Sequence, residues 1–235
     1  QGNLLREGVD SEKIHVTGNS VIDALNFVSK QDEPQEIKNL LEKLEVSSLS
    51  AHRLRYAPLS AKETNELKTK KLILVTAHRR ENFGKPMENI FHALKEIAER
   101  DDVEIVYPVH LNPNVQEPAN RVLKDLKHIT LLPPLDYLPL VHLMKHATLI
   151  LTDSGGIQEE APAFGIPVLV LRETTERPEG VDAGTLKLVG TETSRIVEEA
   201  QRLLDDPVEY GKMSKASNPY GDGHAAERIV EALLN

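Results

Sequence analysis

From Leu72 to Leu171 the chain alternates short apolar runs with amphipathic segments, and this alternation limits the fold more than any other feature. The apolar runs predict buried strands over Leu72–Thr76, Val103–Tyr107, Ile129–Leu132, Leu149–Leu151 and Val168–Leu171. The segments between them predict helices over Met87–Arg100, Val115–Leu126, Tyr137–Lys145 and Gly155–Phe164. Continuous apolar strands separated by helices are typical of a parallel sheet covered on both faces. We therefore expect an α/β fold, a Rossmann-like doubly wound parallel sheet, over residues 71–216.

Weaker patterns flank this region. Downstream they predict a strand over Leu186–Val189 and helices over Thr193–Leu204, Val208–Lys215 and His224–Leu234. Upstream they predict a strand over Ile14–Val16 and helices over Val21–Val28 and Glu36–Leu44. Residues 47–69 are polar without a clear period, which indicates an insertion or linker. Pro162 would disrupt a helix interior, so the helix at 155–164 is expected to be very short or kinked.

Charge and composition limit the partners. The chain has 28 Lys and Arg against 37 Asp and Glu, a net charge of −9, which argues against nucleic acid or an anionic membrane as the main partner. The absence of cysteine from the sequence excludes disulfides, thiolate metal sites and cysteine nucleophiles. No apolar run approaches the roughly 20 residues that span a bilayer, and no signal-peptide pattern opens the chain. We expect a cytoplasmic protein.

Polar residues follow the predicted strands at the edge where open α/β sheets bind ligands. His78 and Arg79 follow the first strand and suit a phosphate, although a solvated charged loop accounts for them equally well. His110 follows the second strand as a candidate ligand contact, while Asn112 and Pro113 beside it are explained by the start of a helix. Several strand ends of this kind together indicate a site at this edge.

The run Leu149–Leu151 leads into a Gly-rich turn and a predicted helix. Ser154 can cap that helix, and the two glycines after it let backbone N–H groups approach an anion closely. Glu159 and Glu160 follow about one helical turn later, where a carboxylate can accept hydrogen bonds from sugar hydroxyls. A phosphate at a helix end beside a carboxylate is how such folds hold a nucleotide. An ordinary capped turn explains the same residues, so both interpretations stay open at this point.

Several familiar motifs are missing from the sequence. It has no Walker A loop, no G-x-G-x-x-G after a strand, no G-x-S-x-G elbow, no H-E-x-x-H and no EF-hand loop. Kinase, NAD-dehydrogenase, hydrolase and zinc-protease interpretations therefore lose most of their support. The remaining hypothesis is a nucleotide-diphosphate pocket without an obligatory metal, and no cofactor is expected.

Segments of this chain resemble, in order, the non-hydrolysing UDP-N-acetylglucosamine 2-epimerases of bacteria. They are Val75–Asn82, Tyr107–Pro113, Leu151–Glu160 and Thr175–Glu179, with weaker matches at Val16–Leu25 and Asn218–Gly223. The likeness covers almost the whole chain outside about 31–70. It implies a GT-B fold, with this chain as its C-terminal half. The implied reaction interconverts UDP-GlcNAc and UDP-ManNAc at C2 by elimination and re-addition of UDP, for cell-surface polysaccharide synthesis.

The resemblance also implies roles for particular residues. Ser154, Gly155 and Gly156 would hold the diphosphate of UDP at the helix end. Glu160 would bind the ribose hydroxyls, and Arg177 would contact the nucleotide part of the substrate.

Three further residues match family positions near the reacting centre. His78 would lie beside the diphosphate with a catalytic role. Arg79 and His110 match positions that in some members bind a second, activating UDP-GlcNAc. No metal site is implied.

The family's candidates for proton removal at C2 lie in an N-terminal domain that this chain lacks. Residues 1–30 would then be the end of that domain and the crossover, and residues 31–70 a helix plus an irregular insertion or linker. Residues 217–235 would return toward the missing domain. The full-length protein is expected to be a homodimer and the isolated chain inactive. Another GT-B enzyme (a glycosyltransferase or a hydrolysing 2-epimerase) and a binding module without activity are the alternatives.

Overall fold

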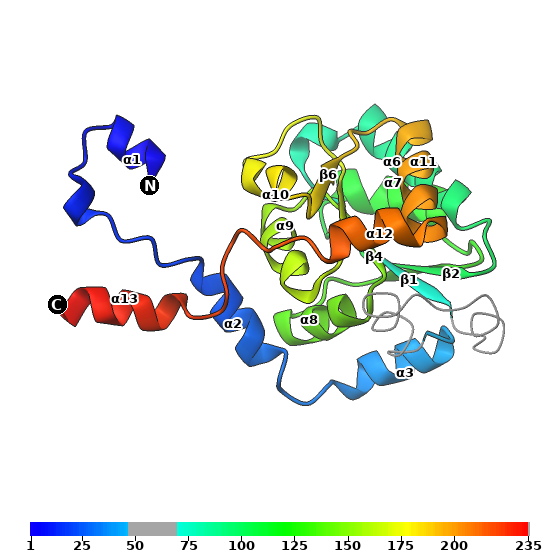
Figure 1. The fold of residues 1–235 in the computed structure, drawn as a ribbon. Coiled ribbons are helices and arrows are strands. Elements are labelled where there is room, and N and C mark those ends of the chain that lie inside the picture. Colours follow the sequence, from blue (N-terminus) through cyan, green and yellow to red (C-terminus); the bar gives the residue numbers. More distant parts are fainter. Residues whose placement is uncertain (47–69, 235) are drawn as a thin grey trace.

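The computed structural model describes residues 1–46 and 70–234, and its strands form a six-stranded parallel sheet (Figure 1). The strand order is β3-β2-β1-β4-β5-β6. The strands are β1 Lys71–Thr76, β2 Val103–Pro108, β3 Ile129–Leu132, β4 Leu149–Thr152, β5 Val168–Val170 and β6 Leu186–Leu188. Each agrees with its predicted strand to within one residue at either end. The expected doubly wound α/β fold is confirmed.

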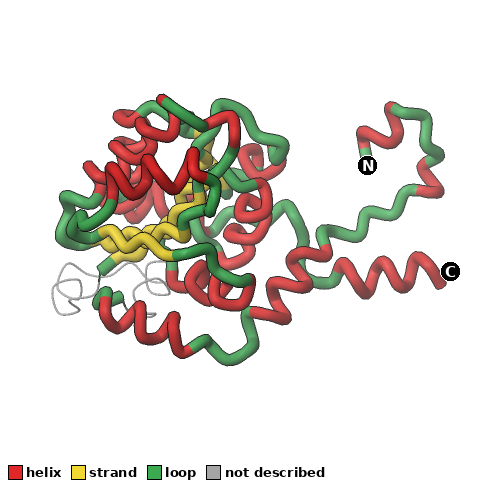
Figure 2. Tube along the Cα trace, turned by 180° about the vertical axis from the view of Figure 1, so that it is seen from behind, coloured by secondary structure: helices red, strands yellow, loops and turns green. Residues whose placement is uncertain are grey.

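Helices cover both faces of this sheet and form two arms beside it (Figures 1 and 2). The helices are α1 Gly2–Arg6, α2 Ser20–Val28, α3 Gln35–Lys43, α6 Lys85–Ile97, α7 Pro113–Leu123, α8 Tyr137–His146, α9 Gly155–Glu160, α10 Pro178–Asp182, α11 Thr193–Asp205, α12 Pro207–Ser214 and α13 Ala225–Leu234. Short 3-10 turns lie at Ser11–Lys13, Arg80–Asn82 and Ala161–Phe164.

The two faces of the sheet carry separate apolar cores because successive strand residues point to opposite sides. On one face Ile73 and Val75 of β1 pack with α6, α7 and α11. On the other face Leu72 and Leu74 pack with α2, α3, α8 and α9. These four β1 side chains are fully buried, as expected for a parallel sheet covered on both sides.

The chain reverses its winding direction between β1 and β4. After β1 it builds β2 and β3 on one side, then returns to add β4, β5 and β6 on the other. Ligands of open α/β sheets bind at such a switch point, beyond the carboxyl ends of the strands. The turns that follow Thr76 and Thr152, which are register partners, therefore border the candidate site.

The structure corrects the predicted strand over Ile14–Val16. These residues follow a 3-10 turn and continue extended, without strand pairing among the described residues, and Val16 is 69% exposed. Their β-branched side chains favour an extended backbone, but a strand also requires a neighbour to pair with. Figure 1 shows this segment on an arm that lies away from the sheet.

Pro162 ends the helix that follows β4. The α-helix α9 stops at Glu160, and Ala161–Phe164 continues as a 3-10 turn with Pro162 in its first turn. A proline near the start of such a turn loses no intrahelical hydrogen bond. Of the two expected outcomes, the very short helix is correct. The predicted insertion or linker at 47–69 lies outside the described residues.

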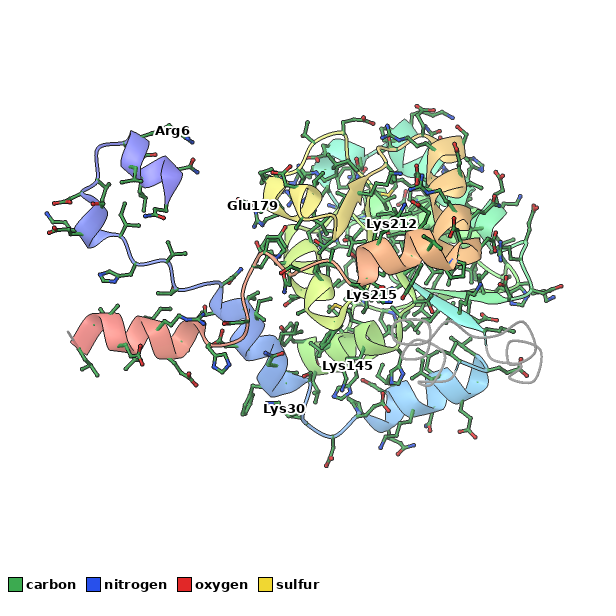
Figure 3. All side chains as sticks on the ribbon, viewed as in Figure 1. Arg6, Lys30, Lys145, Glu179, Lys212 and Lys215 are labelled. Atoms are coloured by element: carbon green, nitrogen blue, oxygen red, sulfur yellow. The ribbon has the colours of Figure 1, made fainter. Side chains whose placement is uncertain are left out.

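Both ends of the chain project from the same side of the sheet domain (Figures 1 and 2). The C-terminal arm, α13, is tied at its start to α2, where the backbone N–H of Ala226 donates to Asp23 at 2.9 Å. Further along, α13 exposes Val230 and Leu233, by 54% and 80%. Figure 3 shows Arg6 on the N-terminal arm, apart from the sheet domain.

Candidate nucleotide site

Asp153 organises the switch point from a fully buried position. It follows β4 directly, and its carboxylate accepts hydrogen bonds from the backbone N–H groups of His78 at 2.9 Å and Arg79 at 2.8 Å. The side-chain amide of Asn82 donates a third bond at 3.0 Å and also reaches the carbonyl of Leu171. A buried carboxylate needs such donors to offset its lost hydration. The turns after β1, β4 and β5 are thereby held together.

His78 and His110, from the ends of β1 and β2, stack against each other at this edge. Their ring centroids are 5.4 Å apart and their planes differ by 12°. Burial lowers the pKa of His78, and the nearby His110 and Arg79 lower it further, against the opposing effect of the Asp153 carboxylate. A lowered pKa keeps this imidazole neutral near pH 7, so that one ring nitrogen can accept a proton while the other donates a hydrogen bond.

Two guanidinium groups converge over Gly155, the first residue of α9. A β-carbon placed on Gly155 would lie 3.4 Å from Nη2 of Arg79 and 3.7 Å from Nη2 of Arg177. The Nε of Arg79 donates to the carbonyl of Asp153 at 3.2 Å, which fixes the side chain beside the turn. Two cations at the N-terminal end of a helix form a site with the charge and the donors that an anion requires.

The capping role predicted for Ser154 is only half correct. Ser154 occupies the N-cap position of α9 with an extended backbone, but its hydroxyl accepts no capping hydrogen bond from the described residues. Its backbone N–H donates instead to the hydroxyl of Thr152 at 2.9 Å. At Gly156, a β-carbon would approach only the Ser154 hydroxyl, at 4.0 Å. Gly156 is exposed and Ser154 half-buried, whereas Gly155 between them is buried.

Glu160 lies at the far end of α9, paired with a tyrosine. The hydroxyl of Tyr137, at the start of α8, donates to its carboxylate at 2.8 Å. Burial raises the pKa of Glu160, and the negative charge of Glu159 adds to this, while the Tyr137 hydrogen bond opposes it. The Glu160 carboxylate keeps acceptor capacity for sugar hydroxyls, and the Tyr137 oxygen, whose proton is donated to Glu160, can also accept a hydrogen bond.

The predicted site residues thus share one edge of the sheet. They are His78, Arg79, His110, Ser154, Gly155, Gly156, Glu160 and Arg177. Sequence reasoning left out Asp153 and Asn82, which hold the turns, and Asn19, which reaches Glu159 from the start of α2. The position of Asp153, two residues after the apolar run Leu149–Leu151, was a usable signal, because the end of a buried strand brings a charge close to the core. Nothing local in the sequence indicated the contact of Asn19.

The described part of the chain has neither a metal-binding cluster nor a membrane-spanning helix. In residues 1–46 and 70–234 no group of three or more His, Cys, Asp or Glu side chains is arranged to hold a metal ion. Within the same ranges no helix has the length and apolar character needed to cross a membrane.

The chain is similar to known proteins over nearly its whole length. A family model described as UDP-N-acetylglucosamine 2-epimerase matches residues 1–234. The Escherichia coli K12 UDP-N-acetylglucosamine 2-epimerase is 56% identical over 234 residues, which are 99% of this chain and 58% of that protein. This chain therefore spans little more than half the length of that relative.

Solved structures give the same result. The co-structure of S. aureus MnaA with UDP superposes with a TM-score of 0.79 at 46% identity, over 99% of this chain and 57% of that chain. The Neisseria meningitidis UDP-GlcNAc 2-epimerase bound to UDP-GlcNAc superposes with a TM-score of 0.79 at 45% identity, over 99% and 58%. The chain belongs to the UDP-N-acetylglucosamine 2-epimerase family.

Proposed function

We propose that this chain supplies the UDP-binding half of a non-hydrolysing UDP-N-acetylglucosamine 2-epimerase. The observation that carries the proposal is the convergence of Arg79 and Arg177 over Gly155, at the N-terminal end of α9 and at the sheet's switch point. The diphosphate of UDP would lie there, against the backbone of Ser154, Gly155 and Gly156. The relatives solved with UDP and with UDP-GlcNAc support this choice of ligand.

The remaining parts of UDP follow from the positions of the other side chains. Glu160 would accept hydrogen bonds from the ribose hydroxyls, because its carboxylate lies one helical turn beyond the proposed diphosphate position. Arg177 would contact the nucleotide through the guanidinium edge that faces Gly155. These roles fit a nucleotide that runs along α9 from its first residue to its last.

In the proposed reaction the enzyme removes the C2 proton and UDP leaves from C1, which gives a glycal. A proton then returns to C2 on the opposite face of the ring as UDP adds back to C1, so the reaction interconverts UDP-GlcNAc and UDP-ManNAc. Negative charge builds on the departing diphosphate, and preorganised donors around it stabilise that charge. His78, neutral and stacked on His110, would act there as a catalytic group whose ring N–H donates a hydrogen bond to the leaving phosphate.

The second half of the active site would come from an N-terminal domain. Support comes from the 58% of the E. coli relative that this chain spans and from the apolar residues that α13 exposes. Residues 1–30 would be the end of the N-terminal domain and the segment that leads into this one, and residues 31–70 a helix plus an insertion or linker. Residues 71–216 would form the UDP-binding domain, and residues 217–235 would return toward the N-terminal domain. The whole protein would be a cytoplasmic homodimer in cell-surface polysaccharide synthesis.

A second role of the same edge concerns activation. The stacked His110 and the neighbouring Arg79 would contact a second, activating UDP-GlcNAc beside the first. The proposed reaction also differs from those of the two alternative enzyme classes. A glycosyltransferase would need an acceptor for the sugar, which this reaction does not use. A hydrolysing epimerase would release UDP, whereas here UDP is retained and added back.

Titration of the purified chain with UDP, followed by NMR, tests the nucleotide site. We expect a dissociation constant in the millimolar to micromolar range, because one half of a two-domain site lacks the contacts of the other half. A Ser154→Asp and Glu160→Ala double variant should abolish binding, since it puts a carboxylate against the diphosphate and removes the ribose contact. Glu96→Ala, an exposed change on α6, is the control. Unchanged UDP binding by the double variant would contradict the placement.

Epimerisation requires both halves in this proposal. The purified chain should convert no UDP-GlcNAc to UDP-ManNAc, whereas the same chain joined to the family's N-terminal domain should. Turnover by the isolated chain would refute the two-domain assignment and leave the UDP site standing.

A further inference from the structure

Glu159 connects two parts of the chain that lie 158 residues apart. Its carboxylate accepts a hydrogen bond from Nδ2 of Asn19 at 2.6 Å on one oxygen, and an ion pair with Nε of Arg177 on the other. The Glu159 side chain is 14% exposed. Glu159 therefore faces away from its neighbour Glu160, which pairs with Tyr137.

Asn19 lies where the chain enters α2, beside the segment that leads into α13. Its backbone N–H donates to the carbonyl of Tyr220 at 2.8 Å, and its side-chain oxygen accepts from the N–H of Val21 at 3.0 Å. The adjacent Gly18 and Gly221 have φ of +91° and +149°, and a β-carbon on Gly221 would lie 3.3 Å from the nitrogen of Asn19. We call residues 18–19 with 220–221 the crossing. Its two segments run side by side in close backbone contact.

One edge of the Arg177 guanidinium faces the proposed diphosphate position beside Gly155. Its backbone N–H donates to the Thr175 hydroxyl at 3.0 Å, and Nη1 donates to the carbonyl of Glu176 at 3.1 Å. Together with the bond from Nε to Glu159, these contacts fix the plane of the group. Nη2 is the nitrogen directed at Gly155. An arginine held in this way loses little side-chain entropy when it binds a phosphate.

We propose that Glu159 is a positioning residue, which holds Arg177 in place for the diphosphate and links that contact to the crossing through Asn19. This inference rests on the proposed UDP site. A phosphate bound to Arg177 competes with the Glu159 carboxylate for the guanidinium. Among the described residues, the other hydrogen-bond donor to the Glu159 side chain is Asn19. Ligand binding at α9 should therefore alter the contact between Glu159 and Asn19 at the crossing, where the segments before α2 and α13 meet.

The test is a double-mutant cycle in which the binding of two ligands is measured for each variant. Dissociation constants for UDP and for uridine are measured by NMR titration of the full chain, its Glu159→Gln and Arg177→Gln variants, and the double variant. Because a charge-assisted contact to the diphosphate is impaired, Glu159→Gln should weaken UDP binding by about five- to twentyfold. The dissociation constant for uridine, which has no phosphate, should change by less than about twofold. In the Arg177→Gln background Glu159→Gln should have no further effect.

A matched control is available in Glu199→Gln. Glu199 is also 14% exposed and forms an ion pair, with Lys187 at 2.6 Å, on a part of the domain that the site does not include. It should leave both dissociation constants unchanged. Thermal unfolding of every variant separates lost binding from lost folding.

A second readout concerns the crossing itself. The side-chain amide signals of Asn19 should shift when UDP is added to the wild type and should stay fixed in Arg177→Gln. Equal weakening of UDP and uridine by Glu159→Gln, or weakening that persists without Arg177, would show a structural role and overturn the inference. Unchanged or tighter UDP binding would also overturn it. Failure of the wild type to bind UDP would instead refute the nucleotide site on which the inference rests.

Discussion

The backbone N–H of Arg79 donates a 2.8 Å hydrogen bond to the buried carboxylate of Asp153. This bond joins the residues that follow β1 to the residue that follows β4, across the point where the sheet reverses its winding. Asp153 thus determines where the Arg79 guanidinium lies relative to Gly155. A residue that touches no proposed ligand atom holds the two sides of the site in register.

Asp153→Asn should therefore destabilise the domain and weaken UDP binding together. An amide keeps one acceptor oxygen and turns an NH2 group toward the donors of His78, Arg79 and Asn82. Leaving buried donors unpaired costs about 2–4 kcal/mol in the free energy of unfolding, measured by urea denaturation. The half-exposed Asp102, which pairs with Lys71 and Arg100, is the control, and Asp102→Asn should cost no more than about 1 kcal/mol. Equal losses at both positions would contradict the role of Asp153.

The sheet was predictable from sequence because its central strands are buried on both faces, although the edge strands β3 and β6 are mostly half-buried. Such strands read as continuous apolar runs, and β1 with its four fully buried side chains is the clearest case. The segment Ile14–Val16 shows the limit of this signal. Its residues favour an extended backbone, but whether a strand forms depends on a neighbour that the local sequence does not identify.

The site residues also fall into those whose proximity could be predicted from sequence and those whose proximity could not. Residues such as Ser154, Gly155 and Glu160 belong to one contiguous turn and helix, so their proximity follows from sequence alone. The contact between Asn19 and Glu159 depends on how the start of α2 packs against α9, and no short-range pattern encodes that. Likewise, the convergence of Arg79 and Arg177 results from the strand order, which brings the turns after β1 and β5 to the same helix end.

Tyr107 supports the turn that carries His78 from inside the core. It is fully buried against Phe91, and its hydroxyl donates to the carbonyl of Ala77 at 2.6 Å. Tyr107→Phe keeps the ring and removes that donor, so it should lower the free energy of unfolding by about 1–2 kcal/mol. Chemical denaturation measures the loss. Tyr210→Phe, which removes a longer 3.1 Å bond to the carbonyl of Thr148, is a comparison remote from the site and should leave UDP affinity unchanged.

His78 makes the stability of the domain depend on pH. Its pKa is lowered in the folded chain, so below the ordinary value of 6.5 the unfolded chain binds the proton more readily. The free energy of unfolding should fall as the pH drops from about 6.5 through the lowered folded pKa. His78→Gln should reduce this slope, as measured by urea denaturation at several pH values. An unchanged or steeper slope in His78→Gln would show that the imidazole is not held neutral by the fold.

The pair of Glu160 and Tyr137 predicts a pH dependence of UDP binding with a definite sign. Only the carboxylate form of Glu160 accepts two hydrogen bonds from a diol, and burial raises its pKa above the ordinary 4.5. UDP affinity should therefore fall on acidification, at a higher pH than an ordinary glutamate would cause. Because the Tyr137 hydrogen bond favours the carboxylate, Tyr137→Phe should move this midpoint to still higher pH. Titrations of UDP binding between pH 4.5 and 8, in wild type and Tyr137→Phe, measure both midpoints.

Glu160→Gln separates this effect from other groups that titrate in the same range. The amide is neutral at every pH used, so the acid-side loss of affinity attributed to Glu160 should disappear while the weaker binding itself remains. His78 gains a proton over part of the same range, and an added positive charge beside a diphosphate strengthens binding, which is the opposite sign. The terminal phosphate of UDP also gains a proton at about pH 6, which weakens binding in the wild type and in Glu160→Gln alike. An acid-side loss as large in Glu160→Gln as in the wild type, or a midpoint that moves to lower pH in Tyr137→Phe, would exclude Glu160 as the ribose acceptor.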